Sequence, residues 1–170
     1  MPEKKEIFYE GKKLDKENFD KINNEFKTES PRAVAILGCS YLDYLLNELL
    51  KKRLIKDNAL FKRVIDNLTF ERRINLCFLV GCFKKRVQED LLIINNIRND
   101  FTHKMDINNF NIKKISSKCD KLQIADKMRK AMKSVNFGDP RIKYTASVIH
   151  YMAAIELFTS QTCKRIEENK

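Results

Sequence analysis

The sequence contains few of the residues that end helices and turn the chain. Four glycines, three prolines and no tryptophan occur among 170 residues. Because glycine and proline mark most turns, their shortage favours long helices over many short strands. No stretch shows the convincing alternation of apolar and polar residues that marks a half-buried strand. The sequence therefore predicts an all-α protein.

Motifs for metals, nucleotides and membranes are missing too. The five cysteines form no Cys-x-x-Cys pair, so no zinc ligand pair stands at the usual spacing. No P-loop, dinucleotide-binding glycine pattern or helix-turn-helix is present. The longest apolar run, Leu76 to Phe83, is too short to cross a bilayer. We expect a cytoplasmic protein with no metal, cofactor or membrane span, whose cysteines are reduced and buried.

What the chain has in quantity is apolar residues and positive charge. Hydrophobic residues make up 43% of the sequence, which is enough for one domain with a proper core. The net charge of +11 suits a polyanionic partner, although a lysine-rich solvated surface explains it equally well. We expect a single helical domain over 1–170, in which residues 1–28 form a charged, loosely packed segment and 30–168 a helical bundle.

Helix signals recur along the chain. Ser30-Pro31 and Asp139-Pro140 each place a capping side chain before a proline at the first helical position. Asp57 and Thr69 can cap two further helices. Residues 113–119 are basic and predicted to be weakly ordered. The patterns predict a bundle of about six or seven helices, over about 15–27, 31–55, 57–67, 69–81, 84–103, 120–134 and 140–167.

The segment Arg98-Asn99-Asp100-Phe101-Thr102-His103 carries the most chemistry. On a helical wheel Arg98 falls in the middle of an apolar stripe made by Val87, Leu91, Ile94 and Phe101. A guanidinium on an apolar face needs a partner or a ligand. One interpretation is a buried structural ion pair with Glu48 or Asp43. The other is a phosphate-binding cation, with His103 beside it to move protons near neutral pH.

The Arg-x4-His spacing, with Asn99 directly after the arginine, resembles the motif of the HEPN superfamily of helical proteins, which includes many RNA endonucleases. Residues 33 to about 105 also resemble the mannitol operon repressor (MtlR-like) family. This second resemblance rests on the order of four stretches: residues 33–38, 41–50, 73–76 and 97–103. The sequence Asn67-Leu68-Thr69-Phe70 replaces the Gly-Pro-Leu turn that this family usually carries. Both resemblances imply a helical bundle.

The HEPN resemblance implies a metal-independent RNA endonuclease of the toxin or defence kind. His103 would act as general base or acid, Arg98 would stabilise the scissile phosphate, and Asn99 would orient either group. The site would form across a homodimer, because one chain supplies one such histidine; His150 is expected to be a core or half-buried residue. Basic residues would bind the RNA: Lys84, Lys85, Arg86 and Lys104, with the runs 51–53 and 113–114.

The MtlR-like resemblance implies a different class of function. A protein of that kind would be a non-enzymatic transcriptional regulator that acts by binding a protein partner, without a DNA-reading helix. The net charge favours the nuclease, whereas the greater extent of the second resemblance favours the regulator. An antitoxin is a possible protein partner in the first case.

Overall fold

The computed structural model describes residues 8–9, 12–13, 16–54, 57–132 and 134–161, and side-chain burial from residue 20 onward within them. Within these ranges the chain forms eight helices and one small hairpin. The hairpin strands, β1 (Phe8–Tyr9) and β2 (Lys12–Lys13), pair antiparallel. The helices are α1 (Lys16–Thr28), α2 (Pro31–Arg53), α3 (Asn58–Val64), α4 (Phe70–Leu79), α5 (Lys85–His103), α6 (Lys113–Cys119), α7 (Gln123–Ala131) and α8 (Pro140–Gln161).

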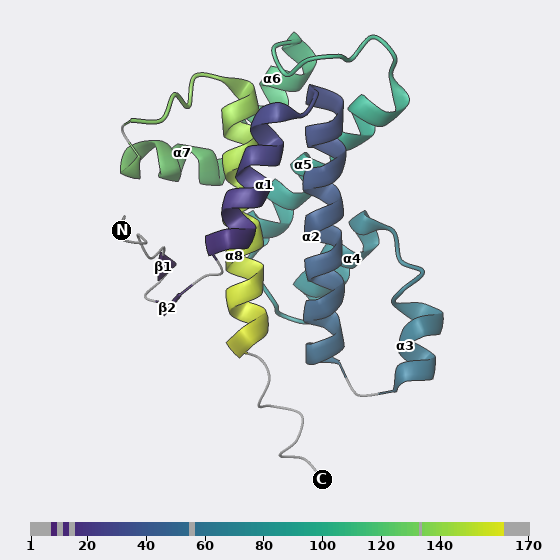
Figure 1. The fold of residues 1–170 in the computed structure, drawn as a ribbon. Coiled ribbons are helices and arrows are strands. Elements are labelled where there is room, and N and C mark those ends of the chain that lie inside the picture. Colours follow the sequence, from purple (N-terminus) through teal and green to yellow (C-terminus); the bar gives the residue numbers. More distant parts are fainter. Residues whose placement is uncertain (1–7, 10–11, 14–15, 55–56, 133, 162–170) are drawn as a thin grey trace.

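The core lies where α2 packs against α4, α5 and α8 (Figure 1). Helix α2 is long and apolar enough to span a membrane by length and composition, although it contains no long uninterrupted apolar run. Its apolar character has a second explanation in this bundle, because eight of its residues are buried against neighbouring helices. Gly38 allows α2 and α8 to approach closely: a Cβ there would lie 3.2 Å from a methyl group of Val148.

The predicted helix starts are confirmed. The Ser30 hydroxyl accepts a hydrogen bond from the Ala33 amide at 3.2 Å, directly before Pro31. Asp57 and Thr69 cap α3 and α4 in the same way. These caps satisfy amides that have no partner within the helix. The all-α prediction is likewise confirmed, since apart from the short hairpin every element in the described ranges is a helix.

Two local predictions are wrong. Residues 113–119, expected to be weakly ordered, form α6. Ile115 and Cys119 are four residues apart and both fully buried, and α6 packs on α5 and α8, so tertiary burial outweighs weak local preference. The hairpin β1–β2 was also unexpected, because two-residue strands are too short to show alternation. Cys39, Cys77, Cys82 and Cys119 are buried as predicted, whereas Cys163 lies outside the described residues.

Candidate functional site

Helix α5 carries the predicted site. Leu91, Ile94 and Phe101 are fully buried, as the apolar stripe predicts. Arg98 lies within this stripe but is only half-buried. The helix continues without a break to His103, with Lys104 as its C-terminal cap. This segment therefore keeps regular helical geometry through the whole motif.

The side chain of Arg98 lines a hollow between α2 and α5. The hollow has a volume of about 300 Å³, and Phe70 from α4 contributes to its lining. Arg98 Nη2 donates a hydrogen bond to Asn95 Oδ1 at 3.3 Å. Within the described part of the chain Arg98 forms no ion pair. The other residues that line the hollow are Ile36, Cys39, Ser40, Asp43 and Thr102.

The structural ion pair predicted for Arg98 belongs to another arginine. Asp43 pairs with Arg73, whose Nη2 also donates to the Ile65 carbonyl at 3.1 Å. Glu48 pairs with Lys51 at 2.7 Å. Both predicted carboxylates thus hold other cations, and the buried structural role falls to Arg73 instead of Arg98.

His103 and Arg98 do not share a face of α5. Five residues separate them, which is about 140° around a continuous helix. His103 is exposed at the last helical position, whereas Arg98 turns toward α2 and Asn99 is half-buried. Because α5 stays helical as far as His103, the side chains of His103 and Arg98 lie on different sides of the helix. Within one chain, this segment therefore does not place His103 in the hollow that Arg98 lines.

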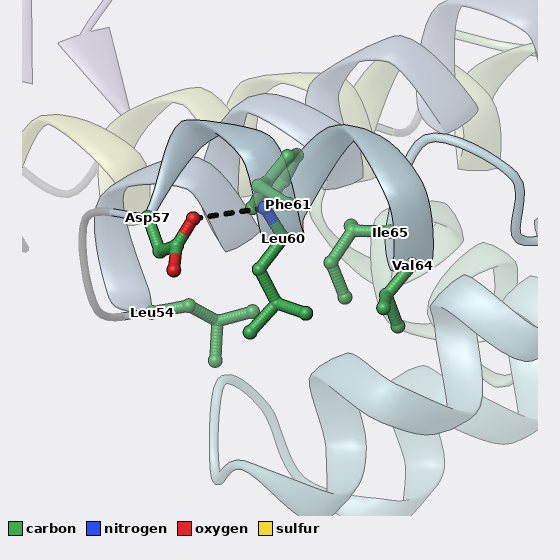
Figure 2. A pocket seen from close by; sticks show the side chains of 6 residues that line it. All are labelled: Leu54, Asp57, Leu60, Phe61, Val64 and Ile65. Carbon is green, nitrogen blue, oxygen red and sulfur yellow. Dashed lines mark hydrogen bonds between the residues drawn. The ribbon is translucent and has the colours of Figure 1, made fainter.

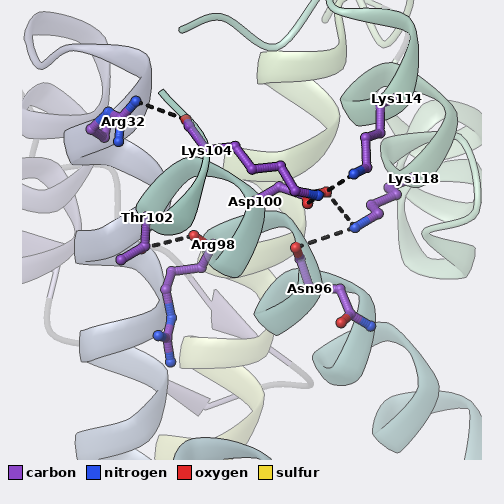
Figure 3. A network of polar contacts seen from close by, with 8 residues as sticks. All are labelled: Arg32, Asn96, Arg98, Asp100, Thr102, Lys104, Lys114 and Lys118. Carbon is purple, nitrogen blue, oxygen red and sulfur yellow. Dashed lines mark hydrogen bonds and ion pairs between the residues drawn. The ribbon is translucent and has the colours of Figure 1, made fainter. Parts of the chain in front are cut away.

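Asp100 organises a cluster of lysines at the end of α5 (Figure 3). Its carboxylate is almost fully buried and pairs with Lys104, with Lys114 at 3.2 Å and with Lys118 at 2.6 Å. Burial by itself would raise the pKa of Asp100, but the three ammonium groups hold that pKa below its ordinary value. Arg98 leaves α5 on a different side from this cluster, as Figure 3 shows.

Replacing Asp100 with asparagine is expected to lower the free energy of unfolding by about 2 kcal/mol at pH 7, because charged hydrogen bonds are lost. Since the folded pKa of Asp100 is lowered, its contribution is complete above the unfolded pKa of about 4 and disappears as pH falls through the lower folded value. The difference between wild type and Asp100→Asn should therefore shrink below pH 4. Urea unfolding at several pH values measures this; a difference that does not change with pH would contradict it.

The residues predicted to bind RNA do not form one patch. Lys84, Lys85 and Arg86 lie at the start of α5 and Lys104 just beyond its end, about 28 Å apart for a helix of this length. Lys85 is engaged locally, since its Nζ donates to Gln88 Oε1 at 2.8 Å and lies over the Phe78 ring. Lys104 belongs to the Asp100 cluster.

His150 is half-buried in α8, as expected. Burial, with smaller contributions from Arg86 and Lys127, lowers the pKa of His150 to about 4. Its imidazole is therefore neutral at pH 7. Among the described residues no group of three or more His, Cys, Asp and Glu side chains is placed to hold a metal ion.

A second hollow, which the sequence did not reveal, lies beside α3 (Figure 2). It has a volume of about 290 Å³, and five of its six lining residues are apolar: Leu54, Leu60, Phe61, Val64 and Ile65, with Asp57 as the sixth. No residue of α3 itself is buried. The sequence feature that could have predicted this hollow is the helical spacing of the apolar residues in α3. The same spacing is equally typical of a helix that faces the core, so it did not distinguish the two.

Comparison with solved structures shows which known fold this chain resembles. The chain is similar to a chain in the crystal structure of the MtlR–HPr complex from Escherichia coli, with a TM-score of 0.61 over 81% of this chain and 97% of that chain. The fold is MtlR-like. The two sequences are 16% identical, so this likeness concerns the fold alone. No family model and no curated protein matches the chain.

Proposed function

We propose that this chain is an MtlR-like regulatory protein that acts by binding a partner protein through α3 and the end of α2. The observation that carries this proposal is the uncovered apolar face of α3. Leu60 and Val64 are 45% and 47% exposed, and they border the apolar hollow beside α3. Exposed apolar patches of this kind mark interaction sites in soluble proteins.

The stability of α3 gives a second argument. A helix of seven residues is too short to be stable in water without packing. Here it is held by its Asp57 cap and by partly buried side chains such as Phe61. A partner that covers Leu60 and Val64 would supply the missing packing.

Charge indicates the kind of partner. Lys62 and Arg63 in α3, and Lys51 and Lys52 in the last turn of α2, are exposed beside the apolar residues. We infer that the partner presents an apolar helix face flanked by acidic side chains, because such a face complements both features. The structural relative is likewise a protein crystallised in a complex, with HPr.

The test compares two double variants. Leu60→Ser/Val64→Ser removes the apolar face, and Lys62→Glu/Arg63→Glu reverses the charge. Arg129→Glu/Lys130→Glu, on exposed residues of α7, is the matched charge control, and Met105→Ser, at 90% exposure, is the apolar control. We expect a partner captured from the source organism, then purified, to bind wild type and both controls in calorimetry.

Both α3 variants should weaken that binding at least tenfold while keeping the helical circular dichroism of wild type. Equal binding by wild type and the two α3 variants would contradict the proposed surface. Association of wild type with itself through α3, seen as a mass that rises with concentration in sedimentation, would replace the partner with a second copy.

The RNA endonuclease of the HEPN kind stays a prediction, as does the homodimer that it requires. Incubation with total RNA in EDTA tests it. Cleavage that stops in His103→Ala, and that fails on a 2′-deoxy substrate, is the expected result for that mechanism. RNA left intact by wild type would remove the prediction.

A further inference from the structure

We propose that the hollow between α2 and α5 is a binding site for a small hydroxylated organic anion, whose carboxylate or phosphate binds Arg98. This inference goes beyond the regulator proposal and does not depend on it. The site lies on α2, α4 and α5, apart from the residues of the α3 surface.

The first support is that Arg98 has a charge without a counter-ion. Arg98 is half-buried, and its guanidinium donates a hydrogen bond to the neutral amide oxygen of Asn95 and forms no ion pair among the described residues. A desolvated charge is costly unless a partner compensates it. The two carboxylates predicted to pair with Arg98 are both held by other cations, Glu48 by Lys51 and Asp43 by Arg73.

The groups around Arg98 do not neutralise it. Cys39 is buried beside it, and burial raises the pKa of this thiol to about 12, an effect that Tyr144 and Arg98 only partly offset. The thiol is therefore neutral at pH 7. Asp43 lines the same hollow, but its charge is balanced by Arg73. The hollow thus keeps a net positive charge.

The other lining residues determine which ligand groups fit beside the anionic group that Arg98 binds. Ile36 and Phe70 give the hollow apolar walls, and the hydroxyls of Ser40 and Thr102 lie on its rim. Ser40 Oγ donates to the Ile36 carbonyl at 3.0 Å, and Thr102 Oγ1 to the Arg98 carbonyl at 2.9 Å. Since each hydroxyl already donates its proton, each has lone pairs that can accept a hydrogen bond from a ligand hydroxyl.

Size restricts the ligand further. A volume of about 300 Å³ is at the lower end of small-molecule pockets, so it suits a compact metabolite. A guanidinium binds carboxylate and phosphate equally well in a two-point arrangement. The chemistry common to both is an anionic head with hydroxyl groups, and the experiment below separates the two heads.

The test is calorimetry on the full chain at constant ionic strength, with three matched probes. These are glycerol 3-phosphate, glycerate and uncharged glycerol. We expect one or both anions to bind with a 1:1 stoichiometry and glycerol not to bind. Arg98→Gln should weaken binding about tenfold or more, the usual worth of a charged hydrogen-bonded contact. Arg129→Gln, which removes the same charge from an exposed position of α7, should change it less than twofold.

A second variant guards against misfolding of Arg98→Gln. Ser40→Tyr changes an exposed rim residue and fills the hollow without touching the charge, so it should also abolish binding. Anion binding that survives either variant would place the ligand elsewhere and overturn the proposal, as would equal binding of glycerol. A hexauridylate RNA that binds through Arg98, where both small anions fail, would overturn it in favour of an RNA site.

Discussion

Replacing Asp90 with alanine is expected to lower the free energy of unfolding by about 4 kcal/mol, because three donors lose the buried carboxylate that they share as acceptor. The Asp90 side chain is completely buried in α5. It accepts hydrogen bonds from the Gln123 and Ile124 amides, each at 3.0 Å, and from the Tyr151 hydroxyl at 2.6 Å. This one carboxylate therefore caps the start of α7 and links α8 to α5 through the Tyr151 hydroxyl.

Guanidinium unfolding at pH 7 measures this loss. Glu89→Ala is the matched control, because Glu89 is the exposed neighbour and makes a single side-chain hydrogen bond to Gln123. We expect the control to cost less than about 1 kcal/mol, as exposed polar contacts usually do. Equal losses in the two variants would show that the Asp90 contacts contribute little to stability.

Replacing Arg73 with alanine is expected to cost about 3 kcal/mol of unfolding free energy, because the Ile65 carbonyl and the half-buried Asp43 carboxylate lose the buried guanidinium that they share. Arg73 is 4% exposed and holds both the Asp43 carboxylate and the Ile65 carbonyl. Its loss would also leave Asp43 as an unbalanced charge in the Arg98 hollow. We therefore expect Arg73→Ala to weaken anion binding as well as stability.

Thermal and chemical unfolding of Arg73→Ala should be compared with Arg72→Ala and Arg98→Ala. Arg72 is the exposed neighbour and controls for the loss of one positive charge. Arg98 forms no ion pair among the described residues, so its replacement should change stability little. A loss in Arg98→Ala as large as that in Arg73→Ala would make Arg98 a structural residue and contradict its role as an anion ligand.

Much of the fold followed from local signals in the sequence. Helix starts at Ser30, Asp57 and Thr69 depend on side chains that bond amides three residues away, which sequence spacing fixes directly. The burial of Leu91, Ile94 and Phe101 also followed from the sequence, because their spacing places them on one face of a helix. Helix α6 did not, because its stability comes from packing of Ile115 and Cys119 against distant helices.

For the candidate site, the sequence by itself determined that Arg98 would lie within an apolar stripe and that His103, five positions later, would lie about 140° away on a continuous helix, since both follow from helical periodicity. Only the tertiary structure decided which charges meet. Asp43 and Arg73 are 30 positions apart, and Asp90 and Tyr151 are 61 positions apart. The partner of a charged side chain depends on which helices pack together, and no spacing along one helix contains that information.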